Sequence, residues 1–448
     1  MLGRGDRQPL VARASFVRLV ILAFVAVLAL DHYQQHLSRT PGIDFYQYWA
    51  VPTARRLSSE PLGSPYSESA RYAEVLATFS EQSADPRLRA VNAYRQEPGF
   101  ASDPLLYVLG SWLPEDYTTA LRSYQLLQFA ALGLALFLLA RQASIPGLEM
   151  AILALLMGLY YLPVLSELRV LNTNALQLAA LALAVALLGS ERSRVGGLEA
   201  GLALSLTVFV AFLKPVWAPL PALTMLHLIW RNGWAASARP IAGAAGVAAL
   251  LFAWPAAVFG PAVWNDWFHR VFRDDPGRLV YAIEEGNRSA PVILARATGW
   301  SLSAAAGFLA GVVLLPLLVV LVAQWRAMPS RDLRASLGAL TVRLLARPAV
   351  ALSFGIVAML ALSPLVWWHY YTLALLPIFV LISPGASRWQ VALAVLSFLM
   401  SSGRLGPIYV WFGDSDWATI CGVGFAWLPL LLGLALPFAA PRVDPAGE

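Results

Sequence analysis

The chain has 448 residues, of which 58% are hydrophobic and only 13% are charged, and its mean hydropathy is +0.63. Soluble domains carry roughly 25% charged residues, so this composition excludes an ordinary soluble protein and indicates a polytopic membrane protein. The single cysteine, Cys421, excludes an intramolecular disulfide and a cysteine-based metal site, and the net charge of +6 is typical of arginine-rich membrane loops rather than of a nucleic-acid partner.

Apolar segments long enough to cross a bilayer recur along the whole sequence. Lipid-facing backbone groups need internal partners, so such segments are expected to be helices of about 17–25 residues. We count about twelve, with a range of about 10–13, which predicts an all-α polytopic bundle forming one domain over 1–448. The expected spans are 16–33, 120–140, 147–165, 173–189, 197–213, 216–231, 240–260, 301–323, 348–366, 369–384, 389–403 and 419–439.

The arginines predict the orientation of this bundle. With the N-terminus inside and the spans alternating, the inner segments carry a net charge of about +9 and the outer segments about −3. Short inner loops therefore hold the positive excess that cytoplasmic loops usually carry. We expect both termini in the cytoplasm and two long extracytoplasmic segments, 34–119 and 261–300.

The first outer segment opens with Gly42-Ile43-Asp44-Phe45-Tyr46-Gln47-Tyr48-Trp49. Its aromatic side chains are typical of a membrane interface. Asp44 has two interpretations. It caps a short helix, because Asp is a preferred cap residue, or it is the general base of an enzyme. In the second case Tyr46, Tyr48 and Trp49 are candidate contacts for a sugar or acceptor.

The rest of that segment is not low in complexity. Residues 66–79 have the pattern of an amphipathic helix that begins near Ser67, and residues 86–96 are a second helix candidate. The apolar stretch 103–113 is too short to span, and we expect it to lie in the membrane interface.

Two polar residues stand at the expected outer ends of spans. Lys214 is the only lysine and precedes Pro215. It either snorkels to the interface or contacts a phosphate, since an intramembrane cation needs an anion. His369 lies between Trp368 and Tyr370, and it is either a hydrated interfacial side chain or a group that donates to phosphate or moves a proton.

Asn287-Arg288-Ser289, in the second outer segment, offers a guanidinium between two neutral hydrogen-bonding side chains. Arginine binds phosphate through two parallel hydrogen bonds, but the run also fits an ordinary polar loop. The five histidines are scattered, and no glycine-rich phosphate loop is present. We therefore expect neither a metal nor a nucleotide cofactor.

The order of these motifs resembles the GT-C superfamily of glycosyltransferases that use polyprenol-phosphate sugars, and most closely glycosyltransferase family 87, of bacterial alpha-mannosyltransferase type. Each motif alone is weak, and their order carries the resemblance over nearly the whole chain. The motifs are Asp44 with its aromatics, Asp103-Pro104-Leu105-Leu106-Tyr107, Lys214-Pro215, Asn287-Arg288-Ser289 and Trp367-Trp368-His369-Tyr370.

The resemblance implies transfer of a hexosyl, by family default mannosyl, residue from a polyprenyl-phosphate sugar to a glycolipid or glycan of the cell envelope. The site would face outward from a bacterial cytoplasmic membrane. Inversion needs one base on the acceptor side and cations on the leaving phosphate. The family's base position corresponds to Asp44, and the expected phosphate contacts are Lys214, His369, Asn287, Arg288 and Ser289.

The sequence departs from the family pattern in two places. Arg288 stands where the family often has glutamine, and residues 60–100 form a long, charged loop. Three other functions remain open. A transporter or flippase often has internal repeats and charges at the membrane midplane, of which we find neither. A polysaccharide ligase or polymerase usually has its large loop late in the chain, and a non-enzymatic scaffold remains open if Asp44 is only a cap.

Overall fold

The computed structural model describes residues 7–95, 102–190, 197–270, 287–327, 332–403 and 415–438. Within these ranges the regular structure is helical, and the extended pairing consists of one isolated antiparallel bridge between Asn287 and Trp367. Large apolar side chains face outward on several long helices, including Phe24 (63% exposed), Leu250 (71%) and Leu314 (59%). Such exposure suits a lipid environment, and the expectation of an all-α polytopic membrane protein is confirmed.

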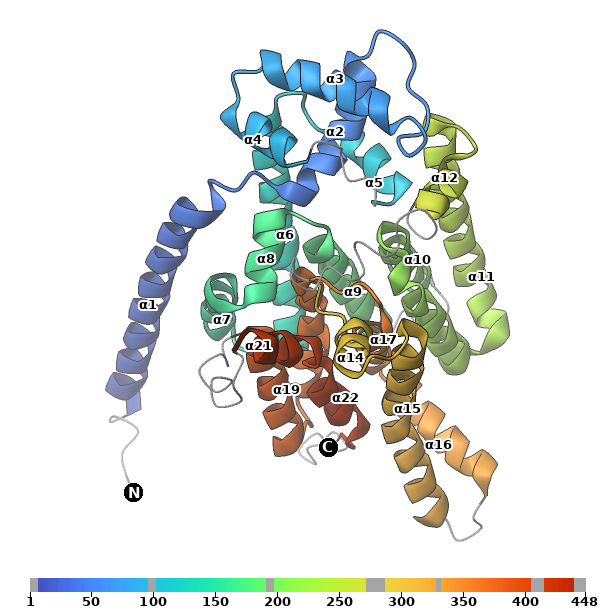
Figure 1. Ribbon diagram of the computed structural model, residues 1–448. Coiled ribbons are helices and arrows are strands. Elements are labelled where there is room, and N and C mark those ends of the chain that lie inside the picture. The colour runs from blue at the N-terminus through green and yellow to red at the C-terminus, as the bar shows by residue number, and fades with distance from the viewer. Residues whose placement is uncertain are drawn as a thin grey trace.

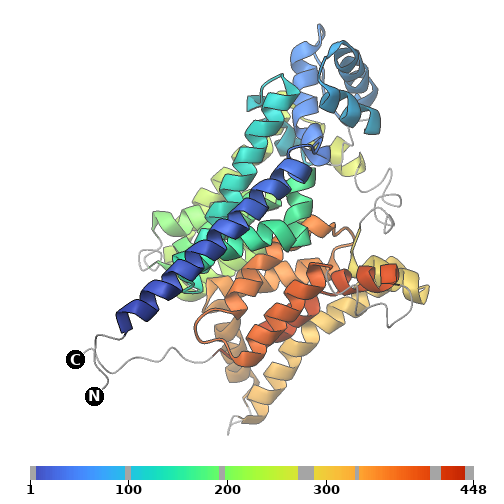
Figure 2. The ribbon, with the colours of Figure 1, turned by 90° about the vertical axis from the view of Figure 1, so that its left-hand side faces the viewer.

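The helices form two parts, which Figures 1 and 2 show as a large bundle with a small helical cap at one end. The cap consists of α2 (Ile43–Leu57), α3 (Ser69–Gln82), α4 (Pro86–Tyr94), α5 (Pro104–Leu109) and η2 (Gly110–Trp112). The bundle begins with α1 (Arg7–His32), η1 (Tyr33–Leu37), α6 (Tyr117–Gln142), α7 (Gly147–Tyr160), α8 (Leu162–Val170), α9 (Asn174–Gly189), α10 (Leu198–Leu213), η4 (Pro215–Trp217) and α11 (Pro219–Phe259). It continues with α15 (Leu302–Ala327), α16 (Leu333–Leu345), α17 (Pro348–Leu362), η6 (Trp368–Ala374), α18 (Leu375–Leu381), α19 (Arg388–Ser401), α21 (Ser415–Gly424) and α22 (Trp427–Ala435).

The expected spans coincide with helices, but the helices differ in length. In the described part of the chain, four helices are long and apolar enough to cross a membrane, or five if the pair α7 and α8, bent by 68°, is one span. The other expected spans are apolar helices of 10–17 residues. Length and composition alone therefore support fewer spans than the twelve expected. Short or broken helices are tolerated where neighbouring protein satisfies their backbone groups.

Two local features differ from the expectation. The segments 216–231 and 240–260 were expected as separate spans, but both lie within α11, which is interrupted at Gly233 (φ 78°, ψ 167°). Only glycine adopts this backbone conformation readily, so the chain changes direction there without a loop. Residues of α16 were expected in an inner loop, yet they form a helix that packs against α15 and α17.

The cap confirms both expected helices of the first outer segment, as α3 and α4. The stretch 103–113 includes α5, which is buried within the protein, since Leu105 and Tyr107 are 0% exposed; its expected position at the membrane interface stays a prediction. Gly110 makes this packing possible, since a Cβ there would lie 2.0 Å from the carbonyl oxygen of Tyr48 in α2. In the second outer segment the structure describes α12 (Val263–His269) and α14 (Ala290–Thr298).

Candidate functional site

The start of α2 brings Asp44 against the turn between α8 and α9. Gly42 is the N-cap of α2, with φ 68°, and Asp44 is in the first helical turn. A Cβ on Gly42 would lie 2.6 Å from Leu121 and 3.2 Å from Leu171, so the sharp entry to α2 needs glycine both for its backbone angle and for its size. On the other side, Leu171 ends α8 in the left-handed conformation.

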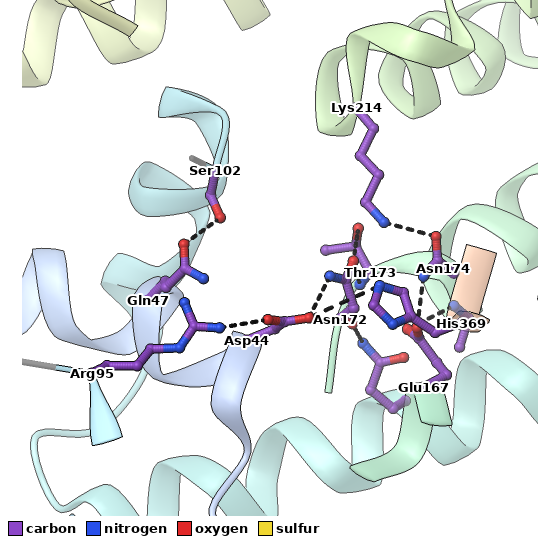
Figure 3. Close-up of polar contacts among 12 residues, drawn as sticks. Asp44, Gln47, Arg95, Ser102, Glu167, Asn172, Thr173, Asn174, Lys214 and His369 are labelled. Carbon is purple, nitrogen blue, oxygen red and sulfur yellow. Dashed lines mark hydrogen bonds and ion pairs between the residues drawn. The ribbon is translucent and has the colours of Figure 1, made fainter. Parts of the chain in front are cut away.

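The Asp44 carboxylate is held from two sides, as Figure 3 shows. Arg95, the C-cap residue of α4, donates from Nη2 to Oδ1 at 3.0 Å, and Asn172 donates from Nδ2 to Oδ2 at 2.8 Å. His369 Nε2 lies 4.0 Å from Oδ2. The side chain of Asp44 is 17% exposed. The carboxylate thus retains acceptor capacity and a small accessible surface.

Asp44 does not cap α2. No side-chain capping bond is present at the start of that helix. Asp103 instead caps α5, accepting from the Leu105 N–H at 2.8 Å. Asp103 is 3% exposed, and burial raises its pKa well above the ordinary value, although the bond from Leu105 opposes the shift. The capping interpretation therefore fits Asp103 rather than Asp44.

A second group of polar side chains lies beside Asp44, around Asn174 at the start of α9. Lys214 Nζ donates to Asn174 Oδ1 at 2.8 Å, and Asn174 Nδ2 donates to Glu167 Oε2 at 2.7 Å. The amide of Asn174 therefore connects the lysine to a carboxylate that is 1% exposed. Glu167 also accepts from the Ala175 N–H at 3.2 Å, so both of its oxygens are engaged.

His369 and Lys214 meet at the same place from different elements. His369 lies in η6, which packs against α8 and α9. Its Nε2 is buried and has no hydrogen bond among the described residues, while its ring contacts that of Tyr370. Lys214 Nζ lies 3.9 Å from the centroid of the Tyr370 ring. The structure thus brings together Asp44, His369 and Lys214, which are far apart in the sequence.

Asn287, Arg288 and Ser289 precede α14, and they contact residues 363–367, the segment that leads into η6. Asn287 donates to the Pro364 carbonyl at 3.0 Å and accepts from the Val366 N–H at 3.0 Å, and Ser289 donates to the Ser363 carbonyl at 2.7 Å. Both side chains are 0% exposed. Their polar atoms hold the chain that leads into His369, so a direct phosphate contact remains a prediction. The guanidinium of Arg288 lies 5.3 Å from the Trp368 ring centroid.

The aromatic residues after Asp44 are packed inside the cap. Tyr46 and Trp49 are 0% exposed. Tyr46 donates to Asn92 Oδ1 at 2.7 Å, and Trp49 donates to the Pro114 carbonyl at 2.9 Å. Burial, with a smaller contribution from Asp44, raises the pKa of the Tyr48 phenol well above its ordinary value. In this structure the three rings support the helix that carries Asp44, and the expected sugar contact remains a prediction.

Sequence reasoning missed four residues of this arrangement, namely Arg95, Glu167, Asn172 and Asn174. The last three were visible as a polar cluster at the junction of two expected spans, a place where polar groups are costly and often functional. Arg95 gave no comparable signal among the many charges of its loop. Within the described ranges no group of three or more His, Cys, Asp or Glu side chains is placed to hold a metal.

Fold and site together define a polytopic membrane protein with a carboxylate, a lysine and a histidine gathered where a helical cap meets the bundle. The profile of glycosyltransferase family 87 matches residues 104–348, more than half of the chain, so the protein belongs to glycosyltransferase family 87. It is therefore a glycosyltransferase, as the resemblance implied. The searches of curated proteins and of solved structures found no match.

Proposed function

We propose that this glycosyltransferase moves a hexosyl, specifically mannosyl, residue from a polyprenyl-phosphate sugar to a hydroxyl of an envelope glycolipid or glycan. The reaction takes place on the extracytoplasmic face and inverts the anomeric centre. The observation that carries the proposal is the position of Asp44, a partly accessible carboxylate beside two groups able to bind phosphate. Family membership supports a transferase over a transporter or flippase.

The geometry supports one base rather than two catalytic carboxylates. Asp44 can accept the proton of an acceptor hydroxyl while Arg95 and Asn172 fix its orientation. Glu167 is the nearby alternative, but it is only 1% exposed, whereas the side chain of Asp44 is 17% exposed. A single accessible carboxylate suits direct displacement, in which the hydroxyl oxygen bonds to the anomeric carbon as the sugar–phosphate bond breaks.

The leaving group is a phosphate, so the reaction develops negative charge away from the base. Preorganised cations and donors stabilise such charge strongly in a site that excludes water. Lys214 is fixed by Asn174 and the Tyr370 ring, and the Nε2 of His369 is directed toward the same region without a hydrogen bond of its own. We propose that these two side chains bind the phosphate of the donor.

The donor is tested with purified protein in phosphatidylglycerol and phosphatidylcholine vesicles. We expect sugar transfer from polyprenyl-phosphate mannose, with a product of inverted anomeric configuration by NMR, and none from GDP-mannose. Transfer from GDP-mannose alone, or a retained configuration, would contradict the proposal. The same assay with polyprenyl-phosphate glucose tests whether the enzyme transfers mannose in preference to glucose.

The side of the membrane is tested separately with Ser83→Cys in a Cys421→Ser background. Ser83 lies at the end of α3 in the cap. A membrane-impermeant maleimide should label intact cells at this position. Labelling that requires permeabilised membranes would place the cap, and Asp44 with it, on the cytoplasmic side.

A further inference from the structure

A cavity of about 310 Å³ lies between the cap and the end of α11, away from Asp44. It is within the size range of small-ligand sites, which begins near 300 Å³. Helix α5 packs against both α2 and α11 here. The residues that line the cavity include Arg55, Arg56, Tyr107, Ser111, Trp254 and Phe259.

The two arginines of this cavity differ in their partners. Arg56 donates to the Ser111 carbonyl at 2.9 Å and lies 3.6 Å from Glu115. Arg55 is half-buried, and its guanidinium lies 4.9 Å from the Phe259 ring centroid. Among the residues that the structure describes, Arg55 makes no side-chain hydrogen bond or ion pair. A guanidinium carries five N–H donors, so Arg55 is able to bind an anion that enters the cavity.

The opposite wall is apolar and continues into a lipid-facing surface. Trp254, at 46% exposed, belongs to the last turns of α11. Earlier on the same helix, Leu250 and Phe252 are 71% and 53% exposed. Tryptophan is enriched at the boundary between membrane and water, where its ring meets lipid headgroups. The cavity therefore has a cation on one side and a surface suited to acyl chains on the other.

We propose that this cavity binds the phosphate group of an anionic membrane lipid, with Arg55 as the phosphate ligand and the end of α11 against the acyl chains. Arg55 is eleven residues after Asp44 on α2, or roughly 16 Å along the helix axis, so this site is separate from the one that contains Asp44. Arginine suits this role because its planar fork matches two phosphate oxygens. The inference does not require Asp44 to be the base.

The test measures lipid binding rather than sugar transfer, so its result is independent of the proposed reaction. Full-length protein is purified in detergent, and the binding of added phosphatidylglycerol or phosphatidylcholine is measured by native mass spectrometry. We expect the first phosphatidylglycerol to bind about fivefold more weakly to Arg55→Gln than to the unchanged protein, since a basic residue near a membrane contributes about that factor. Phosphatidylcholine binding should change less.

Two matched variants complete the test. Arg89→Gln removes the same charge from an exposed position in α4 and should bind phosphatidylglycerol like the unchanged protein. Ser111→Trp keeps Arg55 but fills the cavity, and should weaken binding as Arg55→Gln does. Equal phosphatidylglycerol binding by Arg55→Gln and Arg89→Gln, with unchanged Tm, would overturn the proposal.

A final arm separates a lipid from a soluble ligand. Inorganic phosphate at constant ionic strength should not raise the Tm of the protein, whereas phosphatidylglycerol should raise it in an Arg55-dependent manner. If inorganic phosphate alone produces that increase, the ligand is a free phosphate and the assignment to a lipid is wrong.

Discussion

Two aspartates stand at the starts of two cap helices, and their surroundings differ: one caps its own helix, and the other is held by side chains from other elements. Asp103 caps α5 and is almost completely buried, and burial raises its pKa above the ordinary value. Asp44 stands at the start of α2, where Gly42 is already the N-cap, so its carboxylate extends to Arg95 and Asn172 from other parts of the chain. The Asp44 carboxylate therefore accepts its hydrogen bonds from side chains of other elements.

The largest expected difference between the two aspartates is in catalysis. Asp44→Asn keeps the size and the hydrogen-bonding shape of the side chain but removes the basic oxygen, so kcat/KM should fall by about 10²–10⁴-fold. Asp103→Asn should stay near the unchanged enzyme, because asparagine caps helices about as well as aspartate. Transfer by reconstituted protein measures both. Near-normal activity of Asp44→Asn would make Asp44 structural.

The next largest effect is expected at Lys214, which we propose binds the donor phosphate beside Asp44. Lys214→Gln removes the cation that Asn174 and Tyr370 hold in place, and we expect kcat/KM for the lipid-phosphate donor to fall by about 10²-fold. Arg89→Gln, which removes an exposed charge, is the control. A fall in Tm that parallels the loss of activity would instead indicate that Lys214 supports folding.

A smaller effect concerns the contact between the two helices that carry these aspartates. Gly110→Ala places a Cβ 2.0 Å from the Tyr48 carbonyl oxygen, and backbone atoms cannot move aside as a flexible side chain can. We expect a loss of about 1–3 kcal/mol in unfolding free energy, as for other overpacked cores. Gly133→Ala in α6 is the matched control, since nothing lies within 4 Å of its added Cβ. Equal Tm values for the two variants would contradict this packing.

The smallest expected effect concerns the ion pair between Arg95 and Asp44. Arg95 and Asp44 are 20% and 17% exposed, and partly solvated pairs contribute up to about 1 kcal/mol, or about fivefold in rate. We therefore expect Arg95→Gln to lower kcat/KM by up to about fivefold and Arg95→Lys to recover part of the loss. A 10²-fold loss in Arg95→Gln would instead indicate that Arg95 contacts a substrate.

Much of the fold follows from local composition. Runs of apolar residues located most helices of the bundle, with α16 as an exception, and the amphipathic pattern located α3 and α4. The order of the short motifs pointed to glycosyltransferase family 87, which the profile match then showed. These features can be predicted from the sequence because hydrophobic burial and helix formation depend on residues that are close together in it.

Other features depended on contacts between distant residues. Asp44 is not the N-cap of α2, because Gly42 occupies that position and packs closely against Leu121 and Leu171. The buried position of α5 depends on the absence of a side chain at Gly110. The partners of Asp44 come from α4 and from the turn before α9, and no local pattern encodes a meeting of such separate elements. The sequence by itself located most of the helices, because apolar runs are local, whereas only the tertiary structure decided which side chains surround each aspartate, because packing brings those partners together from distant parts of the chain.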